Sequence, residues 1–101
     1  MSCFKYVLDE SGNPLQEPDV IKWARWFETA ERHIGNDRVG DVQISTVFLA
    51  LDHSFADGPP VLWETLIFGG EHDQYQKRYC TRDEAIAGHA KALGLVKGVA
   101  V

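Results

Sequence analysis

Apolar residues first recur with a helical period, between residues 19 and 33. Five of them fall every three or four positions and would share one helix face: Val20, Trp23, Ala24, Phe27 and Ala30. Arg25 falls on the opposite face, and Trp26 falls at the border of the apolar stripe. Pro18 and Asp19 are typical of a helix start, and the Gly-Asn-Asp sequence at 35–37 is typical of its end. The pattern predicts a helix over 19–33.

Farther along, the apolar period changes to the alternation of a strand. Val42, Ile44 and Phe48 would lie on one face, and Gln43 and Ser45 on the other. From residue 47 both faces become apolar, as in a central strand that is covered on both sides. A second strand is expected over 61–68, and a polar edge strand over 74–80.

The two ends of the chain carry local signals of their own. Two short β-prone runs, 4–8 and 15–16, flank a Gly- and Pro-containing turn and predict a hairpin. Near the other end, Thr81 and Glu84 have the spacing of a capping box that starts a second helix. The apolar stripe of that helix would contain five residues: Ile86, His89, Ala90, Leu93 and Val96.

These elements predict the α+β class, in the order ββ-α-βββ-α. We expect an antiparallel β-sheet, made of the N-terminal hairpin plus a three-stranded meander, packed against two helices. A chain of 101 residues, 45% of them hydrophobic, fits one domain over 1–101. Trp23 and Phe27 should then pack on the sheet against Ile44 and Phe48.

Charge and composition narrow the classes of function. The net charge of −5 argues against binding nucleic acid, because phosphate neutralisation needs a basic face. No apolar run is long enough for a membrane span, and no export signal begins the chain. Cys3 and Cys80 are isolated and lack CxxC spacing, which favours free thiols in a reducing cytoplasm. We therefore expect a cytoplasmic protein, and we leave room for a homodimer.

Acidic and imidazole side chains meet at two turns. Asp52 and His53 close one end of the expected hairpin, whereas His72 and Asp73 lie at its other end, about 20 Å away. Zinc needs three or four ligands that converge within about 2.3 Å. We expect polar turns with hydrogen bonds to loop backbone. The alternative is a small metal-dependent hydrolase that uses Asp52 and His53.

Glu64 is the charged residue of an otherwise apolar strand. An unpaired carboxylate would be costly to bury there. Arg78 or Lys77, on the neighbouring edge strand, could pair with it across the sheet. The alternative is a polar anchor in a ligand groove.

Four residues combine aromatic and guanidinium chemistry, and we call them the aromatic–basic set: Arg25, Trp26, Arg78 and Arg82. Such groups suit a flat, anionic, nucleotide-like ligand, and the expected helix start at Thr81 and Arg82 would add backbone amides. The same residue types anchor protein interfaces, and a solvated surface would also contain them. No Walker, Rossmann, HExxH or G-x-S-x-G pattern occurs, so we expect no cofactor and no catalysis.

Five segments together carry a resemblance: KYVLDESGNP, KWARWFE, GDVQISTVFLALDHSF, GPPVLWETLIFGG and RYCTRDEAIAGHA. In that order they resemble the small uncharacterised accessory proteins of tailed bacteriophages and prophages. The resemblance implies a protein made in the bacterial host cytoplasm that binds, blocks or sequesters a host component. The expected partner is a host protein or a small anionic ligand, plausibly in counter-defence.

Overall fold

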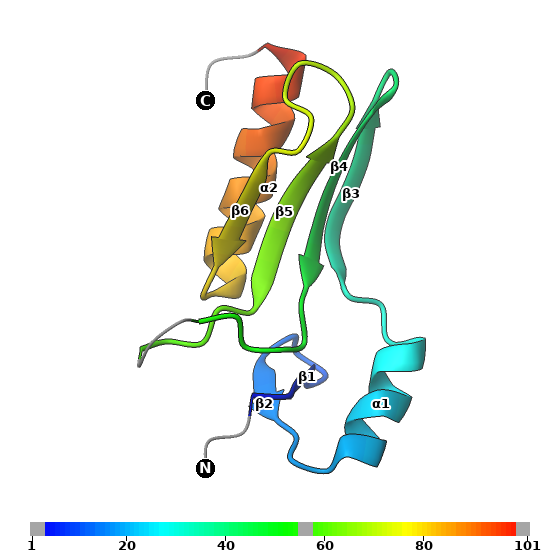
Figure 1. Cartoon of the computed structure of the whole chain (residues 1–101), viewed down its shortest axis with the longest axis vertical. Coiled ribbons are helices and arrows are strands. Elements are labelled where there is room, and N and C mark those ends of the chain that lie inside the picture. Colours follow the sequence, from blue (N-terminus) through cyan, green and yellow to red (C-terminus); the bar gives the residue numbers. More distant parts are fainter. Residues whose placement is uncertain (1–3, 55–57, 99–101) are drawn as a thin grey trace.

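The computed structural model describes residues 4–54 and 58–98. Its eight elements occur in the order β1 (Tyr6–Leu8), β2 (Pro14–Gln16), α1 (Val20–Thr29), β3 (His33–Val39), β4 (Val42–Phe48), β5 (Trp63–Phe68), β6 (Gln76–Tyr79) and α2 (Arg82–Lys97) (Figure 1). The α+β class expected from the sequence is confirmed. None of the helices in the described part of the chain is long and apolar enough to span a membrane.

The main sheet is an antiparallel meander in the order β3-β4-β5-β6. In its register Thr46 of β4 lies opposite Gly35 of β3 and Thr65 of β5, so one row of side chains crosses the sheet. β4 and β5 are central, and β6 is an edge strand, as its polarity indicated. The hairpin β1–β2 forms a separate two-stranded sheet.

The meander has four strands, not the expected three, because β3 occupies residues assigned to the end of the first helix. α1 ends at Thr29, ten residues after Asp19 caps its start. The sequence of β3 alternates poorly because the face toward His89 of α2 carries Gly35 and Asp37 in place of large apolar residues. Gly35 does not end a helix. It lies in β3, where a Cβ would stand 2.5 Å from Nε2 of the His89 ring, so glycine leaves the space that the imidazole fills.

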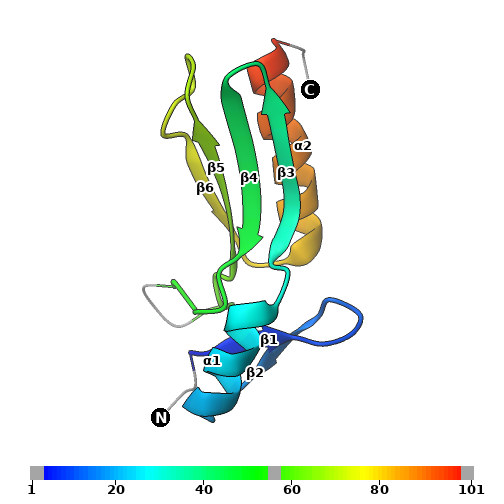
Figure 2. The ribbon, with the colours of Figure 1, turned by 90° about the vertical axis from the view of Figure 1, so that its right-hand side faces the viewer.

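α2 covers one face of the main sheet, and the other face has no helix over it (Figure 2). The expected capping box of α2 is present, since Thr81 Oγ1 accepts from the Glu84 amide and Glu84 Oε1 accepts from the Thr81 amide. The expected apolar stripe is right at three of its five positions, since His89 is buried and Leu93 and Val96 are partly buried against the cluster under α2. Ile86 and Ala90 are exposed instead, and small residues are buried next to the sheet. Those small residues are Ala85 and Ala92.

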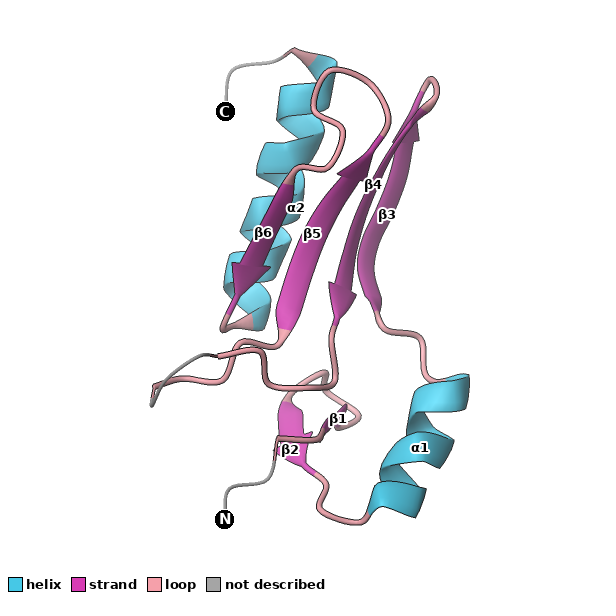
Figure 3. Ribbon diagram, in the orientation of Figure 1, coloured by secondary structure: helices cyan, strands magenta, loops and turns pink. Residues whose placement is uncertain are grey.

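The hairpin β1–β2 and α1 lie together beyond one end of the main sheet (Figures 1 and 3). None of the α1 residues, all of which the structure describes, is buried. Trp23 Nε1 donates to the carbonyls of Tyr6 and Ala50, at 3.1 Å each. This bond pair holds α1 to the hairpin and to the segment that leaves β4.

The predicted packing of α1 is half right. Trp23 and Phe27 are partly buried against the cluster that contains Phe48. Ile44 belongs to a different cluster, with Ile67 and Ala92 under α2. α1 is therefore packed against the end of the sheet and not across its face.

Candidate functional site

A cleft lies where the hairpin, α1, β3 and α2 meet. Its volume is about 430 Å³. Trp26 and Arg82 both line it, together with the buried Trp63 and the turn between β1 and β2. Two members of the aromatic–basic set, which are more than fifty positions apart in the sequence, thus line the same cleft.

The turn between β1 and β2 is held rigidly beside this cleft. Asp9 Oδ1 accepts from the backbone amides of Ser11 (2.9 Å) and Asn13 (2.8 Å). The bond from the Asn13 amide is the main reason that the pKa of Asp9 is lowered. Gly12 has a φ of +84°, and a Cβ there would lie 3.2 Å from Arg82 Nε. Glycine therefore lets the guanidinium lie against the turn.

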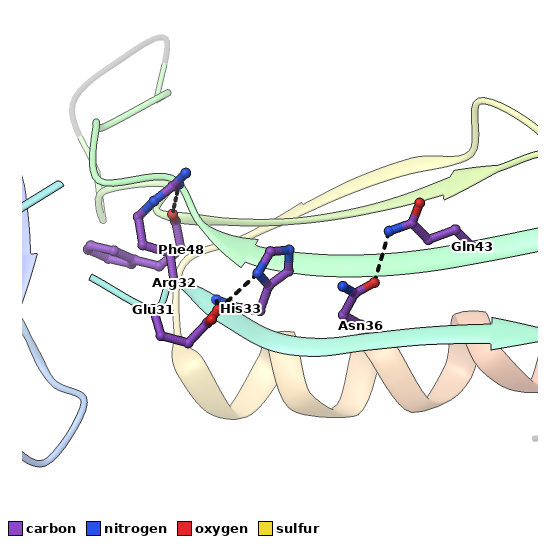
Figure 4. Close-up of polar contacts among 6 residues, drawn as sticks. All are labelled: Glu31, Arg32, His33, Asn36, Gln43 and Phe48. Atoms are coloured by element: carbon purple, nitrogen blue, oxygen red, sulfur yellow. Dashed lines mark hydrogen bonds and ion pairs between the residues drawn. The ribbon is translucent and has the colours of Figure 1, made fainter. Parts of the chain in front are cut away.

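The junction between α1 and β3 also lines the cleft, and Figure 4 shows polar contacts of this junction. Arg32 Nη1 donates to the Phe48 carbonyl at 2.9 Å, and its guanidinium lies 4.1 Å from the centre of the Phe27 ring. Glu31 Oε1 accepts from the His33 amide at 2.8 Å and contacts His33 Nδ1 at 2.9 Å. The amide bond is the main cause of the lowered pKa of Glu31. The Arg32 guanidinium therefore already has a hydrogen-bond acceptor and an aromatic partner within the protein.

Arg82 differs from Arg32 in this respect. Within residues 4–54 and 58–98, no side-chain hydrogen bond or ion pair engages its guanidinium. It also lines a second cleft of about 320 Å³, next to Cys80 and Thr81. Arg82 is exposed between the two clefts and is available to an anionic group.

The amides expected to attract an anion at the start of α2 already have a carboxylate near them. Glu84 Oε1 accepts from the Thr81 amide at 3.0 Å and from the Cys80 amide at 3.3 Å. Asp83 adds a second acidic side chain in the first turn. Recognition of an anion at this point would therefore fall to the Arg82 side chain.

Glu64 and Arg78 form the structural pair expected from their positions on neighbouring strands. They are register partners in β5 and β6, and Arg78 Nε donates to Glu64 Oε2 at 2.9 Å. Gln76 Nε2 also donates to that oxygen. Only 7% of Glu64 is exposed, so these bonds satisfy a buried carboxylate. The pair does not line the cleft at Arg82, and neither does Arg25, which is exposed on α1.

Asp52 holds the loop after β4, in the hydrogen-bonding role expected for it. Its Oδ1 accepts from the amides of Ser54 and Val61 at 2.9 Å each. Burial raises the pKa of Asp52, but these two bonds outweigh it and the pKa is lowered. The His53 amide donates to the Val61 carbonyl. Among the described residues, no group of three or more His, Cys, Asp or Glu is placed to hold a metal ion.

The two cysteines differ in what can be said of them. Cys80 carries a free thiol, which contacts the Pro59 carbonyl at 3.9 Å. Cys3 lies outside the described residues. The described part of the chain thus holds one free thiol at the margin of the second cleft.

A buried polar row was not foreseen from the sequence, apart from the expectation that His89 would be satisfied and partly buried. Under α2, His89 Nε2 contacts Asp37 Oδ2 at 2.6 Å and His89 Nδ1 contacts Thr46 Oγ1 at 2.7 Å. Thr46 Oγ1 contacts Thr65 Oγ1 at 2.6 Å, and the Tyr79 hydroxyl donates to Thr65 Oγ1 at 3.0 Å. We call these five residues the polar row. Two threonines in apolar strands were its only sequence signal.

The most exposed large apolar side chains of the described residues belong to the region beyond the end of the main sheet. Phe4, Leu15, Val20 and Ile21 are 52–61% exposed, more than any other large apolar side chain in residues 4–54 and 58–98. All four belong to the hairpin segment or to the start of α1. We call them the apolar end.

The comparisons with known proteins identify no relative. No protein-family model, no curated protein and no solved structure matches the chain.

Proposed function

We propose that this chain is a non-catalytic binding protein that captures a partner protein through the apolar end and the cleft at Arg82. In the setting that the sequence resemblance implies, it is a phage accessory protein made in the bacterial cytoplasm, and its partner is a host protein that it blocks or sequesters.

One observation carries this proposal: the four most exposed large apolar side chains of the described chain all belong to the hairpin–α1 region. Soluble proteins seldom gather exposed apolar side chains without a function for them, and such patches with a polar border are typical of protein interfaces. Val20 and Ile21 lie in the first turn of α1, which keeps no buried residue of its own. These two exposed side chains therefore add little to the hydrophobic core.

The cleft would add selectivity to this apolar contact. Tryptophan and arginine are the residues that most often dominate the energy of an interface. Trp26 is fixed edge-on against Phe48, with ring centres 5.9 Å apart, and Arg82 has no intramolecular partner among the described residues. An acidic side chain of the partner would supply the missing charge next to an aromatic wall.

The test is capture from bacterial lysate followed by binding of the purified candidate. The double variant Val20→Ser/Ile21→Ser and the variant Arg82→Gln should each weaken binding of that purified protein at least about thirtyfold, which is the effect of an interface hot spot. Ile86→Ser, on the exposed side of α2, is the matched control and should bind as the parent does.

Three results would overturn the proposal. The first is a captured protein whose affinity is unchanged by the apolar-end variants. The second is a stable homodimer in sedimentation that the double variant dissociates, because the patch would then be a self-association surface. The third is a small molecule that co-purifies with the parent and is lost in Arg82→Gln, which would make the cleft a small-ligand site.

A further inference from the structure

A separate cleft of about 250 Å³ lies between β6 and α2, and it shares no lining residue with the cleft at Arg82. Its lining residues are Tyr75, Lys77, Tyr79, Glu84, Ala87, Gly88 and Lys91. Gly88 keeps the helix close to the sheet here, because a Cβ at this position would stand 2.1 Å from the Tyr79 hydroxyl oxygen. The hydroxyl of a buried tyrosine therefore lies against a residue that also lines the cleft.

The charged groups of this cleft are unequally satisfied. Glu84 uses its carboxylate within the capping box, where Oε1 accepts from the Thr81 amide and hydroxyl. In the described part of the chain, neither Lys77 nor Lys91 has an ion-pair or hydrogen-bond partner for its ammonium group. Two free cations thus lie beside two tyrosine rings.

The polar row runs from this cleft to the other edge of the sheet, and with a neutral His89 ring its hydrogens have one consistent direction. The Asp37 carboxylate accepts, so the hydrogen of a neutral His89 ring is on Nε2 and Nδ1 must accept. Thr46 then donates to Nδ1, which leaves Thr65 to donate to Thr46. Tyr79 donates to Thr65 and completes the chain. Each hydroxyl has one hydrogen, so if Thr65 turns to donate to the Tyr79 oxygen, Thr46 must donate to Thr65 and His89 Nδ1 must donate to Thr46 for every pair to keep its bond.

We propose that the cleft between β6 and α2 binds a small molecule with an anionic group, carboxylate or phosphate, on a flat ring. Lys77 and Lys91 hold the anion, and the Tyr79 hydroxyl turns from Thr65 to donate to it. The ring stacks beside Tyr75.

This proposal has a consequence at the far end of the polar row. When Tyr79 turns away, Thr65 no longer accepts a bond from it. Reversing Thr65 and Thr46 restores that contact, with Thr65 donating to the Tyr79 oxygen, and His89 Nδ1 then needs a hydrogen in order to donate to Thr46. Asp37 on β3 contacts the His89 ring, while Lys77 on β6 and Lys91 and Glu84 on α2 line the far end. In the reversed row that we propose for the anion-bound state, His89 takes up a proton from the solvent, and its positive charge then faces Asp37.

The probes are benzoate and phenyl phosphate, titrated by calorimetry at neutral pH in buffers of different ionisation enthalpy. We expect binding with proton uptake, and ¹⁵N-histidine spectra that move His89 from the neutral Nε2–H form toward the doubly protonated form. Lys77→Gln and Lys91→Gln should each weaken binding at least about tenfold, the effect of losing a charge-assisted hydrogen bond. Lys97→Gln, near the end of the same helix, should not. The better-bound probe identifies the anion class.

Two matched tyrosine variants test the coupling between anion binding and proton uptake through the polar row. Tyr79→Phe should weaken binding and abolish proton uptake. Tyr75 lines the same cleft but does not belong to the polar row, so Tyr75→Phe should keep the proton uptake. Melting curves must show that each variant is folded. The site is wrong if neither probe binds the parent, or if binding ignores both lysines. The coupling is wrong if the parent binds without proton uptake, or if Tyr79→Phe retains it.

Discussion

The main sheet with α2 buries its apolar residues, whereas the hairpin with α1 leaves similar apolar residues exposed. Under α2, Ile44, Ile67 and Ala92 are completely buried, and the same layer buries every residue of the polar row except Asp37, with the hydrogen bonds of the row satisfied. At the other end of the molecule, α1 buries no residue completely, and Val20 and Ile21 are more than half exposed. The molecule extends 44 Å along its longest axis and only 23 Å along its shortest.

This contrast indicates a division of tasks. Close packing around the sheet provides most of the free energy of unfolding, because buried apolar area is the dominant stabilising term. The hairpin–α1 region contributes less and keeps its apolar surface for contact with another molecule. Each prediction below tests one side of that division.

The largest difference in stability should appear when an isoleucine is replaced by alanine in each of the two regions. Ile67→Ala, under α2, should lower the free energy of unfolding by about 2–5 kcal/mol, because it removes buried methylenes and leaves a cavity. Ile21→Ala, on α1, should change it by no more than about 0.5 kcal/mol. Urea denaturation of both variants measures the difference. Equal losses would mean that α1 is as tightly packed as the sheet.

Gly88→Ala should destabilise the protein, against the ordinary trend for a helix. Alanine normally favours a helix interior over glycine by about 1 kcal/mol. Here the added Cβ would overlap the Tyr79 hydroxyl, and overpacking of this kind costs about 1–3 kcal/mol. Thermal melting decides the sign. A variant that melts higher than the parent would mean that α2 can move away from β6 at little cost.

Local signals in the sequence predicted much of the fold. The capping box of Thr81 and Glu84, the alternation in β4 and the Glu64–Arg78 pair all depend on neighbours in the chain or on adjacent strands, and all three are present. Such features need only the helical and strand periods and the cost of burying a charge.

The features that the sequence did not reveal depend on contacts between distant segments. β3 was missed because Gly35 resembles a helix end, and its real role is to make room for His89 from α2. The stripe of α2 was wrong at Ile86 and Ala90 only, because small residues, Ala85 and Ala92, approach the sheet. The candidate cleft joins Trp26 and Arg82, and only the arrangement of the hairpin beyond the sheet brings them together.

Trp23→Ala should have an intermediate effect that is confined to one region. The indole is partly buried and bonds to two carbonyls, so its loss should cost about 2 kcal/mol, less than for a fully buried tryptophan. Native-state hydrogen exchange should show faster exchange in α1 and β1, while amides in β4 and β5 keep their protection. Uniform loss of protection would show that the two regions unfold as one unit.

The smallest effect concerns Asp52 and appears only in acid. The pKa of this carboxyl is lower in the folded protein than its ordinary value of about 3.9, because two backbone amides bond to the charged form. Its contribution to stability is therefore complete above about pH 4 and is lost as the pH falls through the lower, folded pKa. Asp52→Asn keeps an acceptor oxygen but carries no charge, so at pH 7 it should cost less than about 1 kcal/mol. Urea melts at several pH values should show the parent's advantage over this variant shrinking below pH 4. An advantage that stays constant down to pH 2 would mean that the charge of Asp52 does not support the loop.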